Sequence, residues 1–134
     1  MRTKTLMAVV LAAVALAGAG CTGGKKERLL RPGLDQFHTG TCYDAAPTVL
    51  AVGDLAIRLR RAGEVSTVDR TTLGSGQREL RKLRTSAELE QPVKDLVTAI
   101  GFVRLRVDSN SYDSKLMEAV LNAEQQVVKR CVDT

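Results

Sequence analysis

The sequence predicts an all-α fold, an antiparallel up-down four-helix bundle closed by one disulfide. Three observations lead to this prediction. Apolar residues recur at spacings of three and four from about residue 45 to residue 132, the period of helices with one buried face. The β-branched alternation typical of strands is absent there. Cys42 and Cys131 stand at the two ends of this region, and four antiparallel helices bring such ends together.

Three parts are expected along the 134 residues. Residues 1–20 are predicted to form a signal peptide, residues 21–41 a lipidated N-terminus with a flexible tether, and residues 42–134 the helical bundle domain. The tether is predicted because this segment mixes glycine, proline and charged residues and shows no sustained period. Its apolar side chains are candidates for packing back on the domain: Leu29, Leu30, Leu34 and Phe37.

The first two helices are predicted at about residues 45–62 and 67–84. Asp44 is the expected N-cap of the first, whose apolar face consists of Val49, Val52, Ala56 and Leu59. The second contains Gly74 and Gly76, each of which costs ~1 kcal/mol relative to alanine inside a helix. Either a break in the helix or close helix packing accounts for these two glycines.

The last two helices carry the clearest patterns. The third is predicted at about residues 87–108, with its apolar face at Leu89, Val93, Leu96, Ile100, Val103 and Val107. The fourth is predicted at about residues 112–132, with Ser111 or Asn110 as its N-cap. Its apolar face consists of Leu116, Val120, Ala123 and Val127.

Cys42 and Cys131 are expected to form a disulfide. In the predicted topology the start of the first helix and the end of the fourth lie at the same end of the bundle, within the ~7 Å between Cα atoms that a disulfide tolerates. The crosslink closes nearly the whole domain, which is worth about 4 to 5 kcal/mol in the chain-entropy model. A pair of free buried thiols is the alternative.

The first 20 residues have the pattern of a secretory leader. Arg2 and Lys4 give a positive start, residues 6–16 an apolar run, and residues 17–20 a series of small side chains before Cys21. The apolar run is shorter than the ~20 residues of a transmembrane helix.

The end of this leader resembles that of a bacterial lipoprotein, in the segment Gly18-Ala19-Gly20-Cys21. The resemblance implies that Cys21 receives a diacylglyceryl group and becomes the new N-terminus, which would anchor the protein to the membrane. Gly18 stands where such leaders usually have an aliphatic residue. The alternative is ordinary cleavage after Ala19, at the A-x-A pattern of residues 17–19, which yields a freely secreted protein.

The number of cysteines favours lipidation. There are three in the chain, and an exported protein with an odd thiol is unusual. Lipidation consumes Cys21 and leaves Cys42 and Cys131 as an even pair. The composition of the rest, rich in Arg, Ala, Val and Leu and poor in Lys, resembles that of small actinobacterial lipoproteins with no assigned activity.

The residue inventory contains little that predicts catalysis. His38 is the only histidine and lies in the predicted tether, so neither a histidine metal site nor a catalytic histidine is expected. The motifs G-x-S-x-G and G-x-x-x-x-G-K-[ST] are absent. We therefore expect no enzyme, no metal and no cofactor. Glu124 borders the apolar face of the fourth helix, and a solvated flank position is its simplest interpretation.

Positive charge is predicted at one end of the bundle. The formal net charge of +5 falls to +3 once Arg2 and Lys4 leave with the leader. The ends of the first and third helices would gather five side chains, Arg58, Arg60, Arg61, Arg104 and Arg106. An anionic envelope polymer or an acidic protein is the partner that such a patch would bind, whereas complementation of the helix dipoles and solubility are the simpler explanation.

Together these features predict an extracytoplasmic lipoprotein on the outer face of the cytoplasmic membrane. It would act as a binding or scaffold module. Nucleic acid is not expected as a partner, because an exported protein does not meet it and few aromatic side chains are available for stacking. The alternative is a small-molecule carrier that uses the bundle core, for which missing side chains at Gly74, Gly76 and Gly101 would leave the space.

Overall fold

The structure is a computed structural model that describes residues 28–133. This part of the chain contains four α-helices, one short 3-10 helix and no strand, which confirms the predicted all-α class. The elements are η1 (Leu34–Gln36), α1 (Thr41–Leu59), α2 (Thr67–Lys82), α3 (Ala87–Asp108) and α4 (Leu116–Cys131).

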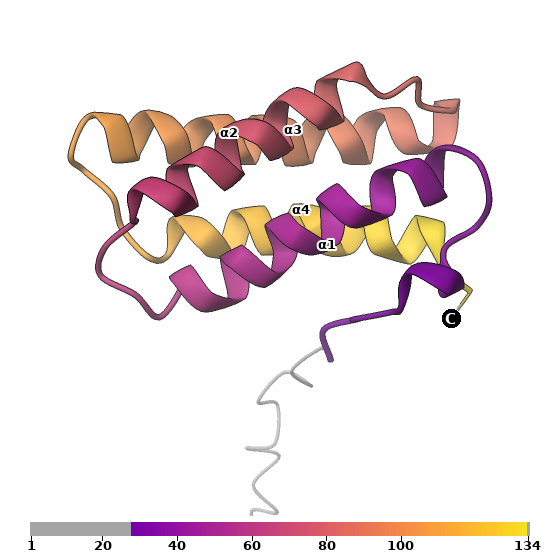
Figure 1. The fold of residues 1–134 in the computed structure, drawn as a ribbon, viewed down its shortest axis with the longest axis horizontal. Helices are drawn as coiled ribbons and strands as arrows, with labels where there is room; N and C mark the ends of the chain where they lie inside the picture. The colour runs from indigo at the N-terminus through magenta and orange to yellow at the C-terminus, as the bar shows by residue number, and fades with distance from the viewer. Residues whose placement is uncertain (1–27, 134) are drawn as a thin grey trace, which may run out of the picture.

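Figure 1 shows the helices in two layers, with α1 and α4 in one layer and α2 and α3 in the other. Contacts join α1 to α2 and α4, and likewise join α3 to α2 and α4. The α1–α2 and α3–α4 connections lie at one end of the bundle. The α2–α3 connection lies at the other end, together with the start of α1 and the end of α4 (Figure 1).

The helix α1 begins and ends earlier than the sequence predicts. Gly40, with φ of 84°, is the N-cap in place of Asp44, and its carbonyl accepts the N–H of Asp44 at 3.0 Å. Glycine suits this position because a positive φ is costly for residues with a Cβ. At the other end the helix stops at Leu59, because the chain tightens into a turn in which the N–H of Ala62 donates to the Leu59 carbonyl.

The helix α2 is continuous through Gly74 and Gly76, so close packing and not a break accounts for its glycines. A Cβ on Gly76 would lie 2.7 Å from Cγ2 of Val52 on α1. Similarly, a Cβ on Gly101 of α3 would lie 2.6 Å from Nε2 of Gln77 on α2. The missing side chains therefore let α2 approach its two neighbours.

The helix α3 spans the predicted residues, but α4 begins later than predicted, at Leu116. Its N-cap is Lys115 and not Ser111 or Asn110. The preceding residues form a turn in which the carboxylate of Asp113 accepts the N–H of Lys115 at 2.9 Å. This side chain competes with the helix for the backbone, as aspartate often does.

Buried apolar side chains from all four helices form one core. Members with almost no exposed surface include Val49, Leu73, Leu96, Ile100, Val120 and Val127. All of them except Leu73 of α2 belong to the apolar faces given above for the first, third and fourth predicted helices. Among the helices of residues 28–133, none combines the length and hydropathy that a membrane span requires.

Residues 28–37, here called the N-terminal strap, lie against the bundle. Phe37 is buried in the core, and Leu29 and Leu30 pack against it, while Leu34 is exposed. Of the four side chains predicted as candidates for packing back on the domain, Leu29, Leu30 and Phe37 do so, although they lie in the segment predicted as a flexible tether. Cys21, the predicted lipidation site, lies outside the described residues.

Two links at the end of α4 hold this region together. Cys42 and Cys131 form the predicted disulfide, with 5.2 Å between their Cα atoms. Beside it, Phe37 and Val132 form an isolated antiparallel bridge, and the N–H of His38 donates to the carbonyl of Cys131 at 2.8 Å. The strap, α1 and α4 are thus joined at one end of the bundle.

We expect replacement of both Cys42 and Cys131 by serine to lower the free energy of unfolding by about 4 to 5 kcal/mol, because the disulfide joins residues 89 positions apart. Urea denaturation of the chain from residue 21 onward measures this loss. Cys21→Ser is the matched control and should leave the unfolding midpoint unchanged. Equal stability of the double variant and the control would contradict the prediction.

Candidate functional site

The strap is held on α4 by a side chain that imitates a backbone partner. Gln125 Oε1 accepts the N–H of Leu30 at 2.7 Å, and Gln125 Nε2 donates to the carbonyl of Leu30 at 3.1 Å. One side-chain amide therefore satisfies both polar backbone groups of one residue, as a neighbouring strand would. Gln125 is only 7 % exposed, so these groups would cost free energy if left unpaired.

The next residue of the strap meets a buried carboxylate. Arg31 donates from Nη1 to Oε1 of Glu124 on α4 at 2.6 Å. Glu124 is fully buried, and its other oxygen, Oε2, accepts a hydrogen bond from Nε2 of Gln125 at 2.7 Å. The Arg31 side chain is 26 % exposed. Glu124 and Gln125, the two α4 residues that bind Leu30 and Arg31 of the strap, are here called the strap clasp.

The strap clasp leaves part of the guanidinium unsatisfied. Within residues 28–133, Nε and Nη2 of Arg31 are buried without a hydrogen-bond partner. The carboxylate of Asp54 on α1 lies 3.6 Å from Nε, too far for a hydrogen bond. Unpaired buried donors carry a desolvation cost, so the clasp holds the strap less tightly than its number of polar contacts suggests.

The electrostatics of Glu124 agree with that conclusion. Burial raises the pKa of this carboxyl group, and the hydrogen bond from Gln125 and the charge of Arg31 offset only part of that shift. The negative charge of Asp54 adds to the increase. A raised pKa means that desolvation of the ionised carboxylate is incompletely compensated in the folded protein.

A glycine on α1 makes room for the clasp. A Cβ on Gly53 would collide with the carboxylate of Glu124 and would lie 2.6 Å from Nη1 of Arg31. Only a residue without a side chain therefore leaves space for the charge pair between α1 and α4. The sequence contains this signal as a glycine in the middle of a predicted helix.

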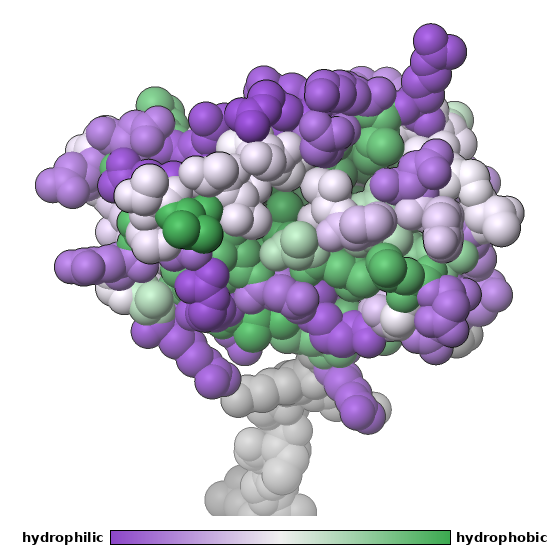
Figure 2. Space-filling model, viewed as in Figure 1, coloured by the Kyte–Doolittle hydropathy of each residue, from purple (hydrophilic) through white to green (hydrophobic). Residues whose placement is uncertain are grey.

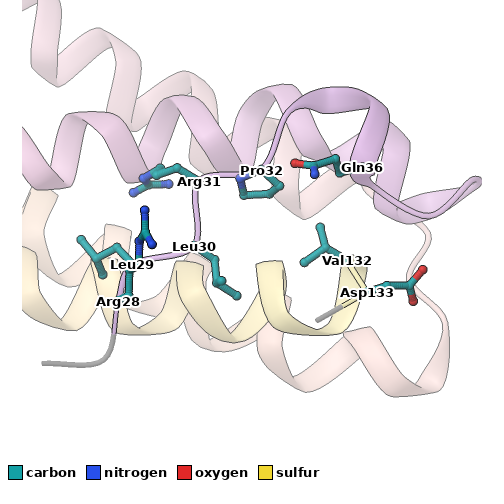
Figure 3. A pocket seen from close by; sticks show the side chains of 8 residues that line it. All are labelled: Arg28, Leu29, Leu30, Arg31, Pro32, Gln36, Val132 and Asp133. Carbon is teal, nitrogen blue, oxygen red and sulfur yellow. The ribbon is translucent and has the colours of Figure 1, made fainter. Parts of the chain in front are cut away.

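A groove of about 560 Å³ runs beside the strap. In Figure 3 Leu30, Pro32 and Val132 border its centre, and Gln36 and Asp133 lie at one end. The guanidinium of Arg31 points away from the centre of the groove, toward α1 and α4 (Figure 3). The strap thus covers this face of the bundle without filling it.

The simplest interpretation of Glu124, a solvated flank position, is wrong. On α4 alone the residue does border the apolar face, as its spacing indicates. The strap covers that flank, whereas the sequence placed these residues in a flexible tether and named only apolar side chains as candidates for packing on the domain. The sequence gives no signal for Gln125 for the same reason, because its amide has a partner only where the strap lies against α4.

The five arginines predicted to form one patch have separate environments. The last turns of α1 and α3 do lie at the same end of the bundle (Figure 1). However, Arg58 donates to Asp69 at 2.7 Å, Arg104 donates to Gln77 at 2.6 Å, and Arg106 lies 5.3 Å from the ring centroid of Phe102. Arg60 is half-buried and Arg61 is exposed. Binding of an anionic partner here stays a prediction.

Asp69 has a structural role in the start of α2. Its carboxylate accepts the N–H of Ser66 at 3.0 Å, and the N–H of Asp69 donates to the Ser66 hydroxyl at 3.1 Å. These two bonds form a capping box in which Ser66 is the N-cap of α2. The hydrogen bond from Arg58 is the main cause that lowers the pKa of Asp69 to about 2.

The space beside the interior glycines is occupied by neighbouring side chains. Val52 faces Gly76, Gln77 faces Gly101, and the guanidinium of Arg104 lies 3.5 Å from the position of a Cβ on Gly74. These contacts give no support to a carrier that uses the bundle core.

A smaller groove of about 320 Å³ runs between α1 and α2, where Figure 2 shows apolar and neutral surface bordered by hydrophilic side chains. Its lining is Pro47, Thr48, Ala51, Val52, Thr71, Thr72, Ser75, Gly76 and Glu79. None of these side chains is basic, so the groove offers an anion no opposite charge.

The described residues contain no group of three or more His, Cys, Asp or Glu side chains placed to hold a metal ion. His38 lies at the surface, where its Nε2 is 2.9 Å from the carboxylate of Asp133.

Comparison of the chain with family models, with curated proteins and with solved structures finds no significant match.

We expect Asp69→Asn to lower the free energy of unfolding at pH 7 by on the order of 1 kcal/mol, because it weakens the bonds to Arg58 and Ser66. Because the pKa of Asp69 is lower in the folded protein, the ionised carboxylate stabilises the fold at pH values above its ordinary pKa of 3.8. This stabilisation is lost as the pH falls toward about 2. Urea denaturation between pH 2 and 7 should therefore show a flatter acid limb for the variant. Asp95→Asn, at an exposed position of α3, should follow the wild type.

Glu124 should give the opposite pH dependence. Because its pKa is raised in the folded state, its contribution to stability is full below the ordinary value of 4.5 and is lost as pH rises through the raised value. We expect Glu124→Gln, which stays neutral, to gain stability relative to the wild type as pH increases from 4 to 7. Glu118→Gln, at an exposed position of the same helix, is the control. A constant difference between Glu124→Gln and the wild type would contradict this assignment.

Proposed function

We propose that the protein is a membrane-anchored extracytoplasmic lipoprotein whose helical bundle acts as a binding module. The observation that carries this proposal is the partition of the cysteines. Cys42 and Cys131 pair with each other, which leaves Cys21, at the end of the leader, as the one cysteine of the sequence for lipidation. Two acyl chains on one residue give stable anchoring, where a single chain is marginal.

The disulfide also supports an extracytoplasmic location. Disulfides persist in oxidising compartments and are rare where glutathione and thioredoxin keep thiols reduced. The basic, apolar and small-residue zones of residues 1–20 are those of an export signal. Export and disulfide formation thus point to the same compartment from independent parts of the chain.

The strap sets how far the domain stands from the bilayer. Seven residue steps separate Cys21 from Arg28, the first described residue, and an extended chain spans at most ~3.6 Å per residue. The domain would therefore lie within roughly 25 Å of the anchor. A lipoprotein with a free tether as far as residue 41 would reach considerably further.

We further propose that the four helices have the antiparallel up-down topology. The connections between consecutive helices are short, and each helix contacts the next one in sequence. The contact between α1 and α4 and the disulfide at their ends support the same arrangement, since an even number of antiparallel helices returns the chain to its starting end.

A binding role is favoured over catalysis because the buried polar side chains have structural partners. Asp69 caps α2, Gln77 bonds to the carbonyl of Val97 and to Arg104, and Glu124 and Gln125 hold the strap. The strap clasp is the best candidate for a binding surface, because it combines a buried carboxylate with a buried amide next to an open groove.

The anchor is tested by the intact mass of the protein purified from bacterial membranes. We expect a chain that begins at Cys21 and carries a diacylglyceryl increment, and we expect Cys21→Ser to lose both the increment and the membrane association. A chain that begins at Gly20 without the increment would overturn the anchor in favour of ordinary secretion. Cys42→Ser with Cys131→Ser controls for nonspecific effects of cysteine loss and should still acquire the lipid.

A further inference from the structure

We propose that the strap clasp is a peptide-binding site that the chain's own strap occupies in cis, and that its external ligand is an extended protein segment in which arginine follows an apolar residue. The inference deepens the binding role proposed above and rests on it. It does not depend on lipidation of Cys21.

The clasp recognises the strap as a peptide receptor recognises its ligand. Gln125 binds the N–H and C=O of Leu30, which any amino acid except proline presents. Glu124 binds the guanidinium of the following residue, which selects arginine. Backbone pairing for affinity and a side-chain contact for selectivity are the two elements of recognition of an extended peptide.

The receptor groups belong to the bundle and not to the strap. Glu124 and Gln125 are neighbours on α4, and Gly53 on α1 leaves the space in front of the carboxylate. The core beneath them is closed by the disulfide between α1 and α4. An arriving segment therefore meets groups that the fold already holds in place, which reduces the entropy cost of binding.

The resident strap is exchangeable because it saturates the site incompletely. Two nitrogen atoms of Arg31, Nε and Nη2, are buried without a hydrogen-bond partner in the described part of the chain, and the groove beside Leu30 and Pro32 is open. The raised pKa of Glu124 agrees with this, because the contacts with Arg31 and Gln125 offset only part of the desolvation of its carboxylate. The strap also lies at the start of the described chain.

Charge favours a cationic partner at this position. Glu124 is buried, and the exposed Asp54 lies beside the same guanidinium, so the site presents two carboxylates to one arginine. An acidic segment would place a third negative charge next to them. The chemistry of the site thus specifies an arginine-bearing extended segment, and displacement of the strap would free the part of the chain closest to Cys21.

The test uses the chain from residue 21 with Cys21→Ser and with Arg31→Ala, which removes the resident guanidinium. The probe is a synthetic peptide with the sequence of residues 25–33, and binding is followed by NMR through the side-chain amide signals of Gln125. We expect saturable binding with a dissociation constant in the millimolar range. A short linker presents a segment in cis at a millimolar effective concentration, so an affinity of this order is enough to keep the resident strap bound. A probe with Arg31→Glu should not bind.

Matched receptor variants separate the clasp from general surface binding. For these variants binding is followed through the NMR signals of an isotope-labelled probe, because Gln125→Leu has no side-chain amide. Gln125→Leu should weaken binding of the probe at least about tenfold, because two hydrogen bonds are lost. Gln126→Leu, at the exposed neighbouring position, should leave the affinity unchanged. Absence of saturable binding, equal binding of the two probes, or equal effects of the two glutamine variants would each overturn the proposal.

A second measurement guards against a misfolded Arg31→Ala chain. In the chain with wild-type Arg31 the probe competes with the strap, so the same Gln125 signals should move at a higher probe concentration. No movement at any concentration would overturn the proposal. These chains carry no lipid, so a negative result here would contradict the peptide site and leave the membrane anchor untouched. An unmodified Cys21 in the mass analysis would contradict the anchor and leave the peptide site untouched.

Discussion

The arrangement depends on the closure of the bundle at one end, where the Cys42–Cys131 disulfide joins the start of α1 to the end of α4. The disulfide joins residues 89 positions apart and therefore removes much of the conformational freedom of the unfolded chain. The bridge between Phe37 and Val132 extends the closure to the strap. Because this end is fixed, the strap runs back along α1 and α4, and its Leu30 and Arg31 reach the clasp.

The clasp shows how a cover segment changes the role of the residues beneath it. Glu124 and Gln125 lie at the flank of α4, and the strap converts this flank into a buried polar site. Buried charge pairs often contribute little net stability, because desolvation offsets their attraction. Such a pair suits a contact that must be specific and reversible better than one that must be strong.

The arginines illustrate the same dependence on tertiary neighbours. In the sequence they form clusters of positive charge near two helix ends, which suggests one anionic partner. In the structure Asp69, Gln77 and the ring of Phe102 each engage one of them. Of these three partners only Asp69 carries an opposite charge, so the contacts fix the positions of the arginines at that end more than they reduce the positive charge.

The sequence by itself determined the helical class, the core faces, the limits of α3 and the pairing of Cys42 with Cys131. The helical features follow from the spacing of apolar residues, and the pairing follows from the number and positions of the cysteines. Both can be read directly from the sequence. Tertiary structure alone decided that residues 28–37 belong to the domain, that Glu124 is buried and that α2 continues through Gly74 and Gly76. The physical reason is that these outcomes depend on which segments pack against each other. Segments about 90 residues apart in the sequence can form a contact without any periodic pattern in either segment that would predict it.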